Sequence, residues 1–278
     1  MVKSPELIEI KEQANIYKEV IANPWMLMGL LIFSISTIIL FIFNLKEDTF
    51  LILNNAASSI ERLRCIPWTH ITNLGDPLLA MMLLFPFVRK KPELIWALIF
   101  AAIFTTILNQ SLKSLVNANR PPAVLSHELF TIIGPAYRSR SFPSGHTVTI
   151  ATIAAIIIYG LKFQWAKWTM LFITLLVGFS RIALGVHWPT DVTAGLFIGW
   201  LGCVFGLTIA ALLKIRTNLI TKHIFTGIFI IVGTIGLFFY KTPYENTLIT
   251  QRILVSILLL IGIKEHYNTI TKLWPLSE

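Results

Sequence analysis

The sequence is built from long apolar blocks that charged residues seldom interrupt. Hydrophobic residues make up 55% of it and charged residues only 13%. Because a soluble domain must present a largely polar surface, such blocks favour an integral membrane protein. Most of them approach the ~20 residues that a helix needs to cross a ~30 Å hydrocarbon layer. We therefore predict an all-α fold, a polytopic bundle of transmembrane helices.

Eight blocks are candidate spans, at residues 25–44, 69–88, 93–112, 147–161, 168–186, 192–213, 224–240 and 248–263. The second block is the weakest, because its first half, THITNLGD, is polar. The fourth is short unless its helix begins at Pro143.

The chain divides into three parts by its apolar pattern. Residues 1–22 carry apolar side chains at helical spacing between Leu7 and Ile21, which predicts an amphipathic helix lying on the membrane surface. Residues 23–213 form the membrane core, and residues 214–278 add two further C-terminal spans. The first segment holds four glutamates and no apolar core, so we do not expect it to be a signal peptide.

Lys and Arg residues predict the orientation, since short cytoplasmic loops are rich in them. Both termini are expected inside, which makes the basic connections 89–91, 162–167 and 214–222 cytoplasmic. The net charge of +9 follows largely from this bias, and no basic surface interleaved with aromatic residues points to nucleic-acid binding. The Ile-, Lys- and Asn-rich composition favours a bacterial plasma (inner) membrane, with the other loops facing the periplasm or exterior. The sequence leaves the oligomeric state open.

The two cysteines predict neither a disulfide nor a metal site. Cys65 is expected outside the membrane and Cys203 in its middle, which is too far apart for the short Cα separation of a disulfide. No cluster of ligand residues accompanies them. We therefore expect the protein to use no metal and no cofactor.

Three polar clusters fall on the predicted outer side, KSLVNANRPP at 113–122, RSRSFPSGHT at 138–147 and SRIALGVHWPTD at 180–191. Taken singly, each has an ordinary explanation: cations that snorkel at a span end, a helix start, or an interfacial polar pair. Together they place four arginines on the side that the orientation rule disfavours, and Glu128 and Asp191 are too few to compensate them. This excess of positive charge predicts an anionic ligand.

The same clusters supply the parts of a phosphate site. A helix that starts at Pro143 would offer unpaired backbone N–H groups at Ser144, Gly145 and His146, with the positive end of the helix dipole behind them. Gly145 has no Cβ to obstruct an approaching anion. The cations that would neutralise the phosphoryl oxygens are Lys113, Arg120 and Arg181.

Two histidines in these clusters fit the two roles that phosphoryl transfer needs. Trp188 precedes a proline and is biased away from helical geometry, so His187 is expected at a turn and Asp191 in the first turn of the next helix. Asp191 can then accept a hydrogen bond from one ring nitrogen of His187 and leave the other as a nucleophile. His146, on a different helix, is the candidate general acid.

The pattern K-x6-RP at 113–121, PSGH at 143–146 and SR-x5-H-x3-D at 180–191 resembles, without a departure, the signature of the type 2 phosphatidic acid phosphatase superfamily. The resemblance covers residues 69 to about 213. It implies a six-helix membrane core, with the last two spans outside it. It also implies a phosphohistidine at His187 supported by Asp191, with His146 acting first as acid and then as base. The residues implied to hold the phosphate, without a metal, are Lys113, Arg120, Ser144, Gly145 and Arg181.

The resemblance also bears on the substrate. Members of this superfamily act on phosphatidic acid, phosphatidylglycerol phosphate, undecaprenyl diphosphate, lipid A phosphates and, in some branches, sugar phosphates. A site at the outer end of a membrane bundle favours a phosphorylated lipid. Arg138 and Arg140 are available for a second phosphate, which favours a diphosphate or a multiply phosphorylated lipid.

Some alternatives stay open from the sequence. The segment TNLGD resembles one found in membrane phosphatases, so Asp76 is expected either near the pocket mouth or as a buried carboxylate that holds two helices together. Besides a phosphatase, two other functions fit these residues. One is a phosphotransferase that passes the phosphoryl group to an acceptor lipid, and the other is a transporter whose intramembrane charges bind an anionic solute.

Overall fold

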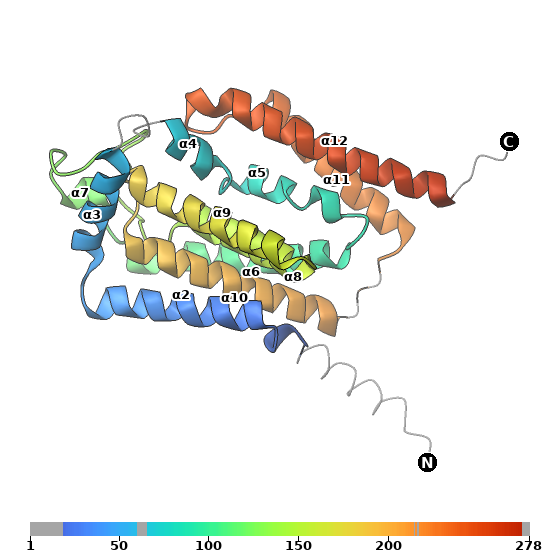
Figure 1. The fold of residues 1–278 in the computed structure, drawn as a ribbon, viewed down its shortest axis with the longest axis horizontal. Helices are drawn as coiled ribbons and strands as arrows, with labels where there is room; N and C mark the ends of the chain where they lie inside the picture. Colours follow the sequence, from blue (N-terminus) through green and yellow to red (C-terminus); the bar gives the residue numbers. More distant parts are fainter. Residues whose placement is uncertain (1–18, 60–65, 214, 216, 274–278) are drawn as a thin grey trace, which may run out of the picture.

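The computed structural model describes residues 19–59, 66–213, 215 and 217–273, and all regular structure in these ranges is helical. The long helices run beside one another in one bundle (Figure 1). This confirms the predicted all-α helical bundle. The predicted surface helix at 1–22 lies outside the described residues up to residue 18, and Cys65 lies outside them as well.

Single helices occupy seven of the eight predicted spans. Within the described residues, six helices are long and apolar enough to cross a membrane, whereas α8 is a shorter apolar helix of 16 residues. The seven helices are α2 Pro24–Ile42, α6 Glu93–Val116, α8 Gly145–Gly160, α9 Gln164–Ala183, α10 Pro189–Leu212, α11 Leu219–Phe238 and α12 Leu248–Leu273.

The second predicted span is broken into α4 Ile66–Asn73, α5 Pro77–Met82 and the 3-10 helix η2 Phe85–Phe87. Asp76 caps α5, because its Oδ1 accepts a hydrogen bond from the backbone N–H of Leu78 at 3.0 Å. Pro77, which has no N–H to donate, occupies the first position of that helix. The prediction of one continuous helix at 69–88 was therefore wrong, and the Asp-Pro pair explains the break.

Two short helices, α3 (Lys46–Ser59) and α7 (Pro121–Val124), were not predicted. The chain turns into α3 at Asn44, whose backbone adopts a φ of 49°. Both helices lie at the same end of the bundle (Figure 1). At this end α2, α6 and α9 finish and α8 and α10 begin.

Helix α10 is the central helix of the core and packs against α2, α6 and α8. Glycines allow the close approach to α8: a Cβ added at Gly199 would lie 2.5 Å from the Cβ of Ala151, and one at Gly195 would lie 3.0 Å from the carbonyl oxygen of Ser144. Small residues at four-residue spacing permit such contacts between membrane helices. This packing brings the first turns of α8 and α10 together.

Helices α11 and α12 form a hairpin that packs against α5 and η2. The rings of Phe85 in η2 and Phe229 in α11 are stacked with centroids 5.2 Å apart. On α12, Gly262 leaves room for the Phe85 ring. The hairpin therefore covers the broken segment α4–α5–η2 and not the first turns of α8 and α10.

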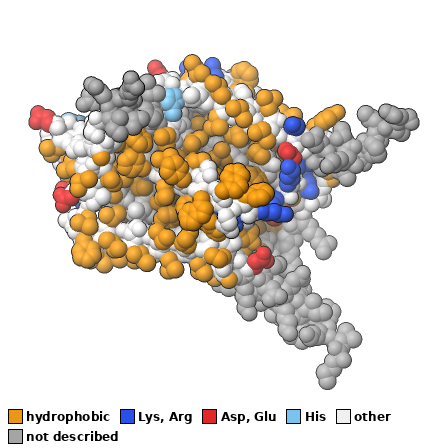
Figure 2. Space-filling view, in the orientation of Figure 1, with side chains coloured by type: hydrophobic (Ala, Val, Ile, Leu, Met, Phe, Trp, Pro, Cys, Tyr) orange, Lys and Arg blue, Asp and Glu red, His pale blue; other side chains and the backbone are white. Residues whose placement is uncertain are grey.

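Large apolar side chains cover the outside of the bundle. Figure 2 shows hydrophobic side chains spread over the visible face. A soluble monomer rarely exposes a continuous apolar surface of this size, whereas a surface that faces lipid tails does so. Examples from five helices are Leu31, Ile107, Phe172, Ile231 and Ile257.

Candidate active site

The three polar clusters meet at the end of the bundle where α3 and α7 lie (Figure 1). Lys113 lies in the last turn of α6 and Arg181 in the last turn of α9. His146 is the second residue of α8, and Asp191 lies in the first turn of α10. Segments that are far apart in the sequence thus bring the predicted residues to one place.

A buried histidine-carboxylate pair lies at the centre of this cluster. The Nδ1 atom of His187 is 3.2 Å from Oδ2 of Asp191, and both residues are 2% exposed. The same carboxylate oxygen accepts hydrogen bonds from the backbone N–H of Trp188 at 2.9 Å and from the hydroxyl of Ser141 at 2.5 Å. Three donors therefore fix Asp191, which in turn orients the imidazole ring.

The second ring nitrogen of His187 faces the cations. Its Nε2 atom is 3.2 Å from Nη1 of Arg120, which also donates to the carbonyl oxygen of Val186 at 3.1 Å. Burial, and next the positive charges of Arg120 and Arg181, hold the pKa of His187 well below its ordinary value. The imidazole is therefore neutral near pH 7, as a nucleophile must be.

The guanidinium of Arg181 is buried with unused hydrogen-bonding capacity. Its Nη1 atom donates to the hydroxyl of Thr72 at 2.7 Å, but its Nε atom has no partner among the described residues. The residue is only 4% exposed. Because a buried charged donor without an acceptor is unfavourable, this group fits the phosphate ligand predicted from the sequence.

The other two cations are held by the chain between α7 and α8. Lys113 Nζ donates to the carbonyl oxygens of Arg140 at 2.9 Å and Pro143 at 2.7 Å. Arg120 Nε donates to the carbonyl oxygen of Ser139 at 2.9 Å. The RSRSFP segment therefore positions the cationic side chains through its backbone.

The start of α8 differs from the prediction in one respect. Helix α8 begins at Gly145 with Ser144 as its N-cap, so Pro143 lies outside the helix. The N–H of Ser144 is not free, since it donates to the backbone carbonyl oxygen of Asp191 at 3.0 Å. The prediction of three unpaired N–H groups was therefore wrong for Ser144, because the glycine-mediated contact with α10 uses that group. Gly145 and His146 have no acceptor for their N–H groups among the described residues.

Protein packing does not explain why residue 145 is a glycine. A Cβ added there would meet only Nδ2 of Asn109, at an ordinary contact distance of 3.7 Å. Asn109 lies one helical turn before Lys113 on α6, and its buried Oδ1 atom has no partner among the described residues. The open space beside Gly145 is therefore better explained by a bound anion than by close packing that would require a glycine.

Sequence reasoning missed three residues of this cluster, namely Ser141, Thr72 and Asn109. Ser141 is fully buried and bonds to Asp191, while Thr72 accepts from Arg181. The only signal for Ser141 was its position inside the second polar cluster. Thr72 begins the TNLGD segment, from which only Asp76 was selected, and Asn109 lies in a span where nothing in the sequence singled it out.

The three further pocket residues predicted from the sequence differ in their surroundings. Arg138 and Arg140 are exposed, and the Nη2 atom of Arg140 donates to Ser114 at 3.0 Å. Asp76 is 4% exposed and accepts from the Tyr240 hydroxyl at 2.5 Å in addition to capping α5. Its contacts match the second of the two predicted roles, a buried carboxylate that joins helical segments.

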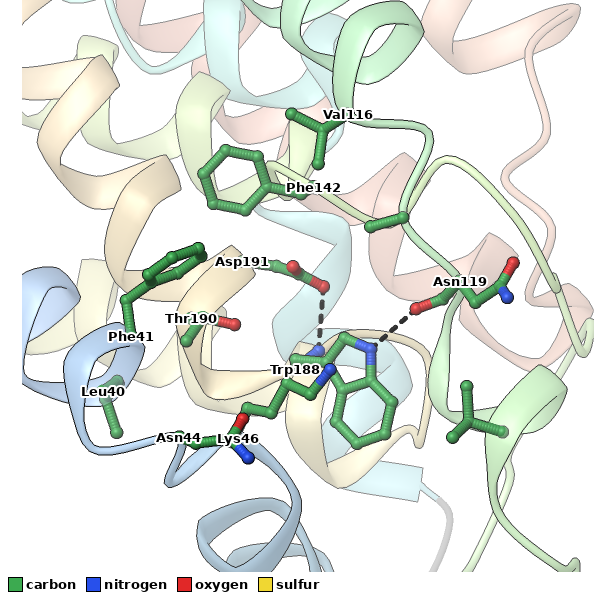
Figure 3. A pocket seen from close by; sticks show the side chains of 12 residues that line it. Leu40, Phe41, Asn44, Lys46, Val116, Asn119, Phe142, Trp188, Thr190 and Asp191 are labelled. Atoms are coloured by element: carbon green, nitrogen blue, oxygen red, sulfur yellow. Dashed lines mark hydrogen bonds between the residues drawn. The ribbon is translucent and has the colours of Figure 1, made fainter.

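A cavity of about 690 Å³ adjoins the candidate active site (Figure 3). Its walls come from the end of α2, the end of α6 and the start of α10. Most lining side chains are apolar, including Phe41, Val116 and Phe142, while Lys46 and Asp191 supply charge. The cavity is thus a largely apolar chamber, and the carboxylate that orients His187 forms part of its wall.

Among the described residues, no group of three or more His, Cys, Asp or Glu side chains lies close enough to hold a metal. The described cysteine, Cys203, is buried and its thiol contacts the sulfur of Met26 at 3.8 Å. The expectation that the protein needs no metal or cofactor stays a prediction.

Comparison with known proteins places the chain in a family. Phosphatidylglycerophosphatase B from Bacillus subtilis is 34% identical over 158 residues, which cover 49% of this chain and 72% of that protein. The model of the PAP2 superfamily matches residues 94–215. The chain belongs to the PAP2 superfamily. The matched PAP2 region contains all the predicted site residues except Asp76 and ends before α11.

Two further PAP2 comparisons agree with this assignment. An undecaprenyl-diphosphatase from Sulfolobus acidocaldarius is 28% identical over 130 residues, and the alignment covers 44% of this chain and 57% of that protein. The crystal structure of Aquifex aeolicus LpxE has a TM-score of 0.51 and 32% identity, over 59% of this chain and 94% of that one. With its six long apolar helices, this PAP2 protein is a multi-pass membrane protein.

Proposed function

We propose that this protein is a membrane phosphatase that removes a phosphate from a lipid phosphate or a polyprenyl diphosphate through a phosphohistidine intermediate. The observation that carries the proposal is the buried pair of His187 and Asp191, with the other ring nitrogen of His187 directed at Arg120. A neutral imidazole beside several cations is suited to attack a phosphate whose negative charge those cations neutralise. The names of the PAP2 relatives support a phosphorylated lipid as the substrate class.

In the first step, Nε2 of His187 forms a bond to phosphorus as the bond to the leaving lipid oxygen breaks. His146 donates a proton to that oxygen. In the second step, His146 accepts a proton from a water molecule that attacks phosphorus, and the bond to His187 breaks. Asp191 holds the ring and stabilises its charged, phosphorylated form.

The phosphoryl oxygens would bind to the cations and to the start of α8. Arg181 has a buried Nε atom with unused capacity, and Gly145 and His146 have free backbone N–H groups. We assign the Ser144 hydroxyl, Lys113 and Arg120 to the same oxygens. Arg138 and Arg140, both exposed at the edge, are assigned to a second phosphate of the substrate.

The apolar part of the substrate fits the cavity beside the site (Figure 3). Its largely apolar lining suits an acyl or prenyl chain, and Asp191, the hydrogen-bond partner of His187, lies in its wall. Lys46, whose Nζ atom lies 5.5 Å from the centre of the Trp188 ring, adds a cation at the rim. This arrangement favours a lipid substrate over a small soluble phosphate ester.

We further propose that the protein lies in the plasma (inner) membrane with both termini cytoplasmic and the site facing the periplasm or exterior. The described chain starts and ends at the end of the bundle opposite the site (Figure 1). The basic residues at 89–91, 162 and 167 lie at that end as well. In this proposal residues 23–213 form the catalytic core, and residues 214–278 contribute the added hairpin.

A substrate panel tests the function directly. Purified protein in detergent would be assayed for phosphate release from undecaprenyl diphosphate, lipid A, phosphatidylglycerol phosphate and phosphatidic acid, with and without an acceptor lipid and with EDTA. We expect phosphate release from at least one lipid, unchanged by EDTA. Transfer to the acceptor without release would instead make the protein a phosphotransferase. Complete loss with EDTA, restored by one divalent ion, would contradict the metal-independent mechanism.

Replacing Ser141 with alanine tests the support of Asp191. We expect kcat to fall by about 10- to 100-fold, since a hydrogen bond to a charged group contributes about 1.5–3 kcal/mol. Ser139→Ala is the matched control, because Ser139 contacts Arg120 only through its backbone carbonyl. Equal activity of the two variants, with equal thermal stability, would show that the Ser141 hydroxyl does not act on the reaction.

A further inference from the structure

At the end of the bundle opposite the candidate active site, Arg89 is buried without a partner. It follows η2 and precedes α6, and it is only 5% exposed. None of its three guanidinium nitrogens has a hydrogen-bond partner within the described part of the chain. A buried guanidinium is unfavourable unless acceptors or an anion surround it, so this side chain indicates a missing ligand.

A second unsatisfied donor follows seven residues later in the chain. The indole Nε1 of Trp96, the fourth residue of α6, is buried and has no partner among the described residues. Its ring packs edge-to-face against Phe225 of α11, with centroids 5.3 Å apart. Because guanidinium and indole groups can only donate hydrogen bonds, both call for an acceptor.

The hairpin α11–α12 covers this segment. Lys90 and Glu265 of α12 form an ion pair at 2.9 Å. The 3-10 helix η2, which ends two residues before Arg89, also packs against α12. The loop after η2 therefore lies against the last turns of α12, and the PAP2 match, which ends at residue 215, does not include this hairpin.

The neighbouring carboxylates and histidine leave Arg89 uncompensated. Glu265 is paired with Lys90, and the Glu93 side chain is exposed and forms no ion pair with Arg89. His266 uses both ring nitrogens, one toward His223 at 3.1 Å and one toward Thr226 at 2.9 Å. Within the described residues, no carboxylate is paired with Arg89.

We propose that Arg89 and Trp96 bind the phosphate group of an anionic phospholipid headgroup at the membrane face opposite the candidate active site. The site lies where the spans end, which is the depth of lipid headgroups, and basic pockets between membrane helices bind such groups. Lys and Arg side chains gather toward this end of the face seen in Figure 2. A phosphodiester offers anionic oxygens to both donors, and its acyl chains lie along the exposed apolar side chains of the hairpin, such as Ile224.

Native mass spectrometry of the full-length protein tests this proposal. Binding of phosphatidylglycerol and phosphatidylcholine would be compared for the wild type, Arg89→Gln and the control Arg252→Gln, whose side chain is exposed near the start of α12. We expect the wild type to prefer phosphatidylglycerol, and Arg89→Gln to bind it at least about tenfold more weakly. Arg252→Gln should bind like the wild type.

Two further experiments distinguish a lipid phosphate from free phosphate and provide a second variant in case Arg89→Gln does not fold. Inorganic phosphate, added without lipid, should stabilise the wild type and Arg89→Gln equally, because it binds at the candidate active site in both. A phosphate effect that Arg89→Gln alone removes would overturn the assignment to a lipid. If Arg89→Gln does not fold, Trp96→Phe removes the second donor and keeps the ring. Unchanged phosphatidylglycerol binding in Trp96→Phe and in any folded Arg89 variant would overturn the proposal.

Discussion

Replacing His187 with alanine should reduce lipid phosphatase activity by at least about 10⁴-fold, which is the scale seen when a covalent nucleophile is removed. The reason is the loss of the Nε2 atom that would form the bond to phosphorus. The anion site should survive, since Arg181, Lys113 and the start of α8 are untouched. We therefore expect vanadate to bind the variant with partly retained affinity.

The control for this prediction is His127→Ala, which removes an exposed histidine from the connection between α7 and α8. It should keep most of the activity. A short incubation of the wild type with radiolabelled lipid phosphate should also trap label on the protein, in a bond that resists alkali and breaks in acid. Substantial activity in His187→Ala, or label retained by that variant, would refute the assignment of the nucleophile.

The second large effect is expected for His146→Ala, and it should depend on the leaving group. For an alkyl or lipid phosphate we expect a loss of about 10²- to 10⁴-fold, because the leaving oxygen needs a proton from a general acid. For a nitrophenyl phosphate, whose leaving group is stable as an anion, the first step should be nearly unaffected. Rapid-mixing measurements of nitrophenol release would then show a burst followed by slow turnover.

The burst arises because His146 would also activate the water of the second step, so the phosphohistidine accumulates without it. The same assay on Thr149→Ala, a substitution one turn further along α8, controls for damage to that helix. An equal loss on alkyl and nitrophenyl substrates would show that His146 is not the general acid. Such a result would leave the role of His187 unaffected.

Both predictions rest on residues that the sequence alone identified. Residue type and spacing are local properties, so Lys113, His146 and His187 were recognisable from the three motifs. The apolar length of each block likewise predicted seven helices close to their observed positions. The break at Asp76 and Pro77 could have been read from the same local chemistry, but the hydropathy of the block concealed it.

Contacts across large separations in the chain could not be predicted in this way. The hydrogen bond from Ser141 to Asp191 and the link from Asp76 to Tyr240 join residues 50 and 164 positions apart. The amide of Ser144 was predicted to be free, yet the close approach of α8 and α10 gives it a partner. Whether a polar group is satisfied depends on which helix faces it, and hydropathy does not specify this.

The sequence by itself determined that this protein is a helical membrane protein and identified the candidate residues of a phosphate site, because span length and motif chemistry depend only on neighbouring residues. The tertiary structure decided which groups in that site are still free to bind a ligand. It also decided that Arg89, ordinary in sequence as one of three basic residues in a loop, is buried under the α11–α12 hairpin without a counter-charge. Burial and pairing are set by the packing of distant helices, so only the folded bundle reveals them.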